Sequence, residues 1–518
     1  MSRSRFSPSD VASATDFEDN SSAEGSISDE NHIAQQDEVA GRPEDRPPMT
    51  QDEVSEFLGI TVADPAIAIS TGYAIKNRRD STSVRYEQHI RDFIAFCRTK
   101  GLGCDVTGDK LLRFINEEIM VRPRRLGWRS RYSVTTAICF LYSKQRLARV
   151  NPYTESPRND AVKARLDFLK SQDLTAANGI ARRDPQRGTE ADGYNSAEKL
   201  LELLNILLLR GTLDAMMLRL AAMLSHFGIL RCNELLGLQL QDCLLLSFNE
   251  ADPIQPGVQV LAFNIRNSKM NADGRKEYAP MMRNKNLLLC PVFAFALSLF
   301  VRFQLLGEPF PQIHQTEDWY HRYVVINHAE PAAPLKSDRY GRLVKALFPE
   351  WRVVTSKCTH IFRQGGARHL DNMQVPKTEV AKHGRWTQDV LTSTYLDSIS
   401  STTVKAHAGF RVQERYLVSR LDVTPPQEVL DMIFPELIEA EVRLTIAEAA
   451  DPDARLVTTN SFLKLLTYFK TVLAQDLALL KHYWDNSQEM RPHPIFNHPM
   501  FESDIFRSWQ ETIVNAVG

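Results

Sequence analysis

Six residues spread over the middle of this chain could act together on a phosphodiester. In chain order they are Arg231, Lys269, His360, Arg363, Trp386 and Tyr395. Attack by an oxygen atom places extra negative charge on the non-bridging oxygens of a phosphodiester, and preorganised cations stabilise that charge. Arginine suits this task because its planar guanidinium can donate two hydrogen bonds to phosphate and keeps its proton. The order of cations, a His/Arg pair and then a Trp nine positions before a Tyr therefore indicates chemistry on a phosphate backbone.

The other members of the set could transfer a proton and supply a nucleophile. Lys269 follows a strand-like run, where a turn would direct it outward to protonate a leaving 5′-oxygen. His360 can act as a general base or acid near neutral pH. Tyr395 could attack phosphorus and form a covalent 3′-phosphotyrosine, which stores the bond energy until a second strand attacks. No Asp/Glu cluster of the magnesium-nuclease type is found in the sequence, so this chemistry is predicted to need no metal and no cofactor.

Each of these residues also has an ordinary structural interpretation. Arg231 could simply pair with Glu234 on a helix, and Lys269 could be a surface turn residue. Tyr395 could be a half-buried helix residue with Trp386 as its core neighbour. Taken one at a time, the structural interpretation is favoured, whereas the ordered set favours function.

The composition is that of a soluble protein of two or three domains. Of the 518 residues 43% are hydrophobic and 24% are charged, and no apolar run approaches the length of a membrane span. The seven cysteines are scattered and form no C-x-x-C pair, which predicts neither a disulfide framework nor a zinc site. A reducing compartment, cytosolic or nuclear, is expected.

Charge is distributed unevenly along the chain. Residues 1–50 contain 4 basic and 11 acidic residues and few large apolar groups, so an acidic, disordered tail is predicted over residues 1–55. Residues 72–172 contain 21 basic and 10 acidic residues, which favours a polyanionic partner. Cations alternate with aromatics in one stretch of this module, a pattern typical of phosphate contact and stacking. The DNA-contact candidates there are Arg122, Arg124, Arg125, Trp128, Arg129 and Arg131.

Periodicity predicts mostly helices, with one hairpin. Residues 72–172 should form several short helices, with Thr107 as the N-cap of one of them, and residues 173–195 should be a linker. Residues 196–247 read as helical, and a β-hairpin is expected from Val258 to Met282. Near the C-terminus an apolar stripe could be core or a seam for a partner helix, and core is the commoner outcome. Its members are Phe462, Leu466, Phe469, Leu473 and Leu480.

Around the six residues the sequence resembles the tyrosine recombinase (phage-integrase-like) family. The matching motifs are residues 228–242 around Arg231, residues 360–367 around Arg363, and residues 383–386 followed by Tyr395. The resemblance implies that all six residues hold the family's catalytic roles. It also implies a helical, SAM-like core-binding domain over residues 72–172 and a catalytic domain over residues 196–440, closing as a clamp on double-stranded DNA. The expected fold is therefore mainly α with a small β-hairpin or sheet, and residues 441–518 form a helical C-terminal extension.

A narrower resemblance lies downstream, at residues 384–386, 408–410 and 433–435. These look like the recombinase-derived domain of the fungal centromere-binding kinetochore subunit, a form that Crypton transposon recombinases share. The chain departs from the usual recombinase pattern directly after Arg363, where a His or similar polar residue is usual. This chain has Gln364 there, followed by Gly365 and Gly366.

Two functions follow as expectations from these resemblances. The first is DNA integration or recombination by a transposon-derived enzyme that breaks and rejoins strands. The alternative is a catalytically idle, domesticated DNA-binding protein, centromeric or transcriptional; a scaffold with a structural Arg pair is a weaker third reading. A nuclear location, a homodimer or homotetramer on DNA and no membrane partner are expected.

Overall fold

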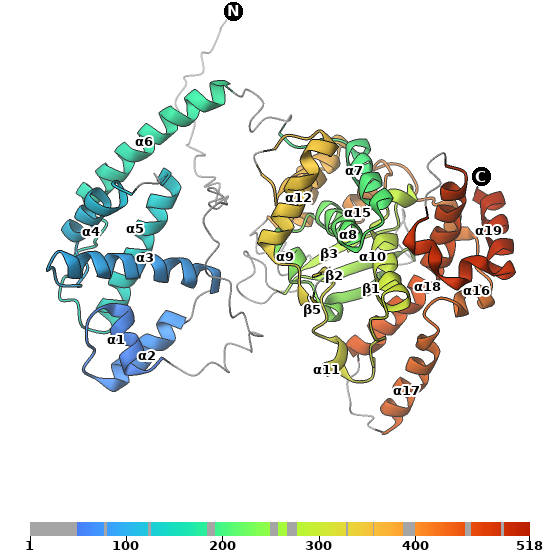
Figure 1. The fold of residues 1–518 in the computed structure, drawn as a ribbon, viewed down its shortest axis with the longest axis horizontal. Coiled ribbons are helices and arrows are strands. Elements are labelled where there is room, and N and C mark those ends of the chain that lie inside the picture. The colour runs from blue at the N-terminus through green and yellow to red at the C-terminus, as the bar shows by residue number, and fades with distance from the viewer. Residues whose placement is uncertain are drawn as a thin grey trace, which may run out of the picture. The chain divides into compact units, whose positions relative to one another are not determined.

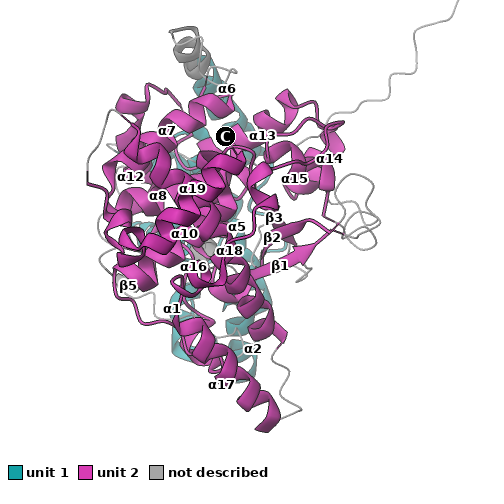
Figure 2. Cartoon of the chain, turned by 90° about the vertical axis from the view of Figure 1, so that its right-hand side faces the viewer, with its two compact units in different colours: residues 1–185 teal, residues 186–518 magenta. Residues whose placement is uncertain are grey.

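In this computed structural model the chain divides into two compact units, Met1–Pro185 and Gln186–Gly518, which are described separately (Figure 2). The described residues are 49–76, 80–122, 126–183, 192–248, 257–266, 277–327, 330–355, 357–386, 399–450, 457–487 and 492–517. Both units are mainly helical (Figure 1), and the predicted fold class, mainly α with a small β-sheet, is confirmed. None of the helices in these ranges is long and apolar enough to cross a membrane.

The first unit is all helical within its described residues. Its helices are α1 (Gln51–Leu58), α2 (Pro65–Lys76), α3 (Asp80–Thr99), α4 (Gly108–Phe114), α5 (Trp128–Leu147) and α6 (Asp160–Arg183), with a π-helical turn at Ile115–Ile119. The apolar stripes of α3, α4 and α5 meet in one core that includes Phe93, Phe114 and Leu141. As predicted, Thr107 caps α4, because its hydroxyl accepts a hydrogen bond from the Lys110 amide.

The structure differs from the sequence prediction at both ends of this unit. Helix α1 begins inside the stretch predicted as a disordered tail, because Thr50 and Glu53 form a capping box and Val54 and Leu58 are buried in the core. The rest of that tail, residues 1–48, lies outside the described residues. At the other end α6 continues to Arg183 and so occupies the first part of the stretch predicted as a linker.

The second unit surrounds a small antiparallel sheet with helices. Its helices are α7 (Ala197–Arg210), α8 (Leu213–Phe227), α9 (Cys232–Leu236), α10 (Pro291–Phe300), α11 (Thr316–Trp319), α12 (Ser337–Trp351), α13 (Ile361–Asn372), α14 (Lys377–His383), α15 (Ser401–His407), α16 (Gln427–Asp431), α17 (Glu436–Ala450), α18 (Val457–Asp485) and α19 (Asp504–Val517). The sheet has the order β1 (Cys243–Ser247), β2 (Gln259–Asn264) and β3 (Tyr278–Met281), and a separate pair is formed by β4 (Ile326–Asn327) and β5 (Glu330–Pro334).

Strand β2 is buried on both faces, which positions the predicted hairpin in the middle of the unit. Phe263 on one face contacts Phe295 of α10, with ring centroids 5.4 Å apart. Val260 on the other face belongs to a cluster with Val404 of α15 and Phe410. The β2–β3 hairpin confirms the sequence prediction, with Leu261 opposite Met281.

Strand β1 corrects the prediction that residues 196–247 are helical throughout. Residues 243–247 pair antiparallel with β2, so that Cys243 lies opposite Phe263 and Ser247 opposite Gln259. A short run of leucines has no periodicity that separates a helix from a strand, and pairing with β2 decides the outcome.

The C-terminal helices belong to the core of the second unit. All five residues of the predicted apolar stripe are buried on α18, and they share one core with the residues of α8 and α10. A buried ion-pair cluster adds to this packing: Asp476 accepts hydrogen bonds from Arg283, at 2.5 Å, and from Arg420, at 2.6 Å. The stripe is therefore core and leaves no seam for a partner helix.

Candidate functional site

The site begins at the turn that joins α8 to α9. Ile229 follows the end of α8, is fully buried and has a φ of 45°, a conformation that β-branched residues rarely adopt. Its carbonyl oxygen accepts hydrogen bonds from the guanidinium groups of Arg363 and Arg385, the latter at 2.9 Å. Backbone strain of this kind persists where surrounding contacts determine the conformation, and it often marks functional sites.

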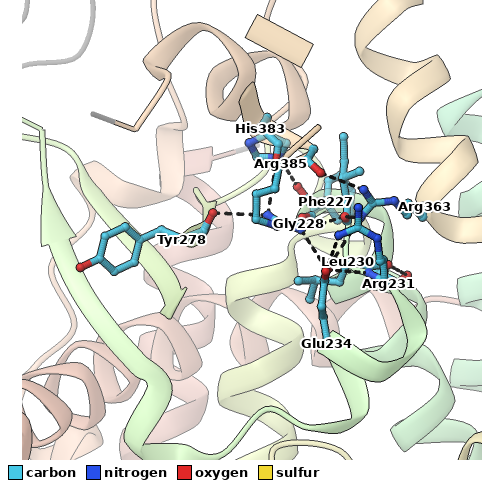
Figure 3. A network of polar contacts seen from close by, with 12 residues as sticks. Phe227, Gly228, Leu230, Arg231, Glu234, Tyr278, Arg363, His383 and Arg385 are labelled. Carbon is cyan, nitrogen blue, oxygen red and sulfur yellow. Dashed lines mark hydrogen bonds and ion pairs between the residues drawn. The ribbon is translucent and has the colours of Figure 1, made fainter. Parts of the chain in front are cut away.

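Three arginines converge on one carboxylate, that of Glu234 in α9 (Figure 3). Arg231, at the N-cap of α9, donates from its backbone amide at 2.9 Å and from Nη1 at 2.5 Å. Arg385 Nη2 lies 3.4 Å from the same carboxylate and Arg363 Nη1 lies 3.7 Å from it. We call these four residues the arginine centre. Because three guanidinium groups face one carboxylate, the arginine centre carries an excess of positive charge.

The excess of positive charge shifts the pKa values of Arg363 and Glu234. Burial, together with the charges of Arg231 and Arg385, lowers the pKa of Arg363 to about 9. Burial opposes ionisation of Glu234, but Arg385 and Arg231 outweigh it and hold the pKa of that carboxyl below its usual value. An anion entering the centre would relieve the repulsion among the guanidinium groups.

Exposure decides which arginine an anion would meet first. The side chain of Arg231 is 20% exposed, whereas that of Arg363 is 7% exposed. Arg363 also donates to the Gly384 carbonyl at 2.8 Å and lies 5.0 Å from the ring centroid of Trp386, a cation–π contact with a partly exposed indole. Arg231 is therefore the more accessible arginine of the centre, and Arg363 lies more deeply buried in it.

The two glycines that follow Gln364 allow α13 to pack tightly on α8 and on the segment that precedes α7. A Cβ on Gly366 would overlap the carbonyl oxygen of His226, and one on Gly365 would overlap the ring of Tyr194. The backbone of α13 thus approaches α8 more closely than any other residue type would permit. This close approach positions Arg363, one turn earlier on α13, against the turn at Ile229.

The structure brings together three of the six residues predicted from the sequence: Arg231, Arg363 and Trp386. His360 lies at the N-cap of α13, one turn before Arg363, and its side chain is half-buried. Lys269 and Tyr395 lie outside the described residues. The strands that flank Lys269 are described, and Ile265 and Glu277 are joined by a backbone hydrogen bond of 2.7 Å.

The DNA-contact candidates of the first unit have different environments. Arg131 is 1% exposed and pairs with Asp173 at 3.3 Å, so it holds α5 to α6 and does not belong to an exposed surface. Arg122 pairs with Asp92 at 2.9 Å. Arg124 and Arg125 lie outside the described residues.

Trp128 and Arg129 do lie on a basic, aromatic surface at the start of α5. Lys170 Nζ lies 5.1 Å and Arg129 Cζ 5.5 Å from the Trp128 ring centroid. Beside them Arg158 stacks on the 47% exposed ring of Tyr132, with Cζ 4.6 Å from its centroid. We call Trp128, Arg129, Tyr132, Arg158 and Lys170 the basic–aromatic face. Arg158 and Lys170 were not predicted, because they are distant in sequence from the Arg-rich stretch.

Arg385 is the main residue of the arginine centre that the sequence prediction missed. It lies between Gly384 and Trp386, inside a matched motif, and its φ of 57° turns its side chain back toward Glu234. Besides the Ile229 contact it donates to the carbonyls of Gly228 and His383, both at 3.1 Å. Its charge and its place inside the motif could have marked Arg385 as a candidate site residue. The direction of its side chain, however, depends on a backbone conformation that the sequence does not reveal.

Comparisons with known proteins give one family match and several structural ones. The family model described as the centromere DNA-binding protein complex CBF3 subunit, domain 2, matches residues 149–507. A search of curated proteins gives no match.

The solved structures with detected similarity include two integrases and a kinetochore protein. The Tn1549 transposon integrase (residues 82–397) in complex with circular intermediate DNA is 14% identical, with a TM-score of 0.35, and the match covers 61% of this chain and 89% of that one. The lambda integrase bound to DNA is 13% identical, with a TM-score of 0.36 and coverage of 71% and 98%. Ndc10 of budding yeast, described as a platform for inner kinetochore assembly, is 12% identical, with a TM-score of 0.33 and coverage of 87% and 98%.

Proposed function

We propose that this chain, which belongs to the family of the centromere DNA-binding protein complex CBF3 subunit, domain 2, is a DNA-binding protein. It would hold a backbone phosphate of duplex DNA at its arginine centre. The observation that carries this proposal is the convergence of Arg231, Arg363 and Arg385 on the single carboxylate of Glu234. A phosphate diester supplies the negative charge that this centre lacks, and its non-bridging oxygens suit guanidinium donors.

The basic–aromatic face of the first unit would supply further contacts. Arginine and lysine side chains neutralise phosphates without reading sequence, and exposed rings stack on sugars or bases. We also propose a nuclear location, because the matching family is described as a centromere DNA-binding complex subunit. Two or four copies on one DNA site would fit the resemblance to tyrosine recombinases.

A finer proposal is that the protein breaks and rejoins DNA through Tyr395. The sequence carries the whole set needed for this chemistry, from Arg231 to Tyr395. One observation favours the alternative, a clamp that binds without cutting: Arg363 donates to the backbone carbonyls of Ile229 and Gly384. Those donors would have to exchange partners before they could stabilise a pentacoordinate phosphorus.

Two measurements on the purified full chain separate these functions. Binding to a labelled duplex at increasing salt tests the DNA-binding proposal, because a protein that contacts several phosphates loses affinity steeply as salt rises. Incubation with nicked or phosphorothiolate duplexes tests cutting, with Tyr395→Phe as the control. A covalent protein–DNA band that needs Tyr395 supports strand transfer, and salt-sensitive binding without such a band supports the clamp. Absence of salt-sensitive binding would overturn both.

A further inference from the structure

Three buried histidines from three helices lie close together in the second unit. They are His226 near the end of α8, His369 in α13 and His407 at the end of α15. One ring nitrogen of each lies within 4.8 Å of those of the other two. Their exposed fractions are 0%, 8% and 4%, respectively. None of the three rings contacts the carboxylate of the arginine centre in the described hydrogen bonds and ion pairs.

His226 and His369 are in direct polar contact. Nε2 of His226 lies 3.1 Å from Nδ1 of His369. The other nitrogen of His226, Nδ1, lies 2.7 Å from the hydroxyl of the buried Tyr194. The hydroxyl orients the His226 ring and leaves Nε2 directed toward His369.

His407 has one ring nitrogen that no hydrogen bond explains. Its Nε2 lies 3.1 Å from the carbonyl oxygen of Gly366. Because a carbonyl oxygen only accepts, Nε2 must carry the proton, and Nδ1 therefore presents a lone pair. Nδ1 is buried and has no hydrogen-bond partner among the described residues. Buried polar atoms are normally paired, so this lone pair needs another partner.

The three rings have the protonation state that metal ions require. Burial lowers the pKa of His369 to about 4 and those of His226 and His407 well below the usual histidine value. All three are therefore neutral imidazoles at pH 7. Neutral imidazole is the commonest protein ligand of transition metals.

We propose that His226, His369 and His407 bind one divalent transition-metal ion of the zinc class. Zn–N bonds of about 2.0–2.1 Å in a tetrahedral site place neighbouring ligand nitrogens about 3.4 Å apart. The 3.1 Å between His226 Nε2 and His369 Nδ1 is close to this separation. We assign His407 Nδ1, which has no hydrogen-bond partner among the described residues, as the third ligand of the cluster. Tyr194 and the Gly366 carbonyl are the outer partners that fix the orientation of two of the rings.

The neighbouring His383 is not part of this site. Its ring centroid lies 5.2 Å from that of His407, but both of its nitrogens have partners. Nε2 lies 2.9 Å from the Phe227 carbonyl and Nδ1 lies 3.4 Å from the Thr403 hydroxyl. His383 therefore supplies no fourth ligand.

The ion would stabilise the part of the fold that positions the arginine centre. Helix α8 leads into the turn at Ile229, and α13 carries Arg363. Joining α8, α13 and α15 through one ion fixes these helices relative to one another. The proposed role is thus structural, and it does not depend on whether the protein binds DNA.

The test uses the untagged full chain, because a polyhistidine tag would itself bind metal. Metal content is measured by mass spectrometry after purification without chelators, and the chelator-treated chain is titrated with Co²⁺, followed by its absorption in the visible range. The expected result is about one equivalent of zinc-class metal or of bound Co²⁺ per chain. His369→Ala and His407→Ala are expected to weaken Co²⁺ binding at least tenfold, because losing a ligand should cost no less than losing an outer partner of a ligand.

The control variant is His493→Gln. His493 is also buried, at 3% exposure, but its Nε2 lies 2.9 Å from the Leu208 carbonyl, outside the cluster. This variant should bind Co²⁺ as the natural chain does. Fewer than about a tenth of an equivalent of metal in the natural chain, both as purified and after titration at micromolar metal, would overturn the proposal. Unchanged binding in both cluster variants would also overturn it. If those variants fail to fold, the measurements on the natural chain alone decide.

Discussion

The carbonyl oxygen of Ile229 accepts a hydrogen bond from the guanidinium of Arg363. Ile229 occupies the left-handed region of backbone space, and its neighbours α8 and α9 hold it there. Arg363 is thus hydrogen-bonded to a strained turn, and this turn leads directly into Arg231. An anion that binds at the arginine centre therefore meets one arginine already fixed by the main chain and one that is more exposed.

The packing of α13 on α8 predicts that Gly366→Ala is strongly destabilising. The added Cβ would overlap the His226 carbonyl oxygen, and because this atom belongs to the backbone it cannot rotate away. We expect the free energy of unfolding to fall by about 3 kcal/mol, the upper end of the range for overpacking. Denaturant unfolding followed by circular dichroism measures the change.

Gly341→Ala is the matched control for this variant. Gly341 also lies within a helix, α12, but its added Cβ would meet only Thr359 Cγ2 at an ordinary 3.6 Å. Alanine is the better helix former, so stability should be unchanged or higher by up to about 1 kcal/mol. Equal losses in the two variants would contradict the close approach of α13 to α8.

The ion-pair cluster on α18 predicts that the C-terminal helices contribute strongly to the stability of the second unit. Asp476→Asn removes the carboxylate that Arg283 and Arg420 share, and both arginines are almost fully buried. Breaking a buried pair in this way should cost about 3–5 kcal/mol. Asp431→Asn, at an exposed carboxylate 3.8 Å from Lys470, should change stability by less than about 1 kcal/mol. Thermal unfolding of both variants checks the prediction, and a small loss for Asp476→Asn would contradict it.

The Arg-rich stretch of the first unit is predicted to contribute to DNA affinity. Replacing Arg124, Arg125 and Arg129 together with Ala should weaken binding to any duplex and flatten its salt dependence. Fluorescence anisotropy at several salt concentrations measures both quantities. Affinity equal to that of the natural chain would exclude this stretch as a DNA contact.

Arg131→Ala should behave differently from that triple variant, although the residue belongs to the same stretch. Its side chain is buried against the partly exposed Asp173, so its removal should lower stability by about 2 kcal/mol, the scale of a hydrogen bond to a charged group, and leave the DNA affinity of the folded protein unchanged. A loss of affinity without a loss of stability would contradict this assignment.

Local signals allowed much of the fold to be predicted. The Thr107 cap, the β2–β3 hairpin and the apolar stripe on α18 each follow from spacing and residue type within a short segment. The family membership was also readable, because the motifs around Arg231 and Trp386 are short and ordered, and the family model confirms the resemblance to the kinetochore subunit.

The rest depends on contacts between segments that are distant in sequence. Burial of Arg131 is decided by Asp173 on another helix, and strand β1 is decided by its pairing with β2. The direction of Arg385 depends on one positive φ angle, and the three histidines of the proposed metal site are brought together only by the packing of α8, α13 and α15. No pattern within a single segment carries that information.

The central claim is that the arginine centre holds a DNA phosphate, and the most direct test compares Arg231→Gln with Arg507→Gln. Arg507 is an exposed arginine on α19 with its own local partner, Asp504, so its replacement changes net charge equally without touching the centre. We expect Arg231→Gln to lower duplex affinity by about 10- to 100-fold, the loss of one charge-assisted contact, and to reduce the salt slope by about 0.9. The same affinity and salt slope in Arg231→Gln and Arg507→Gln would contradict the account.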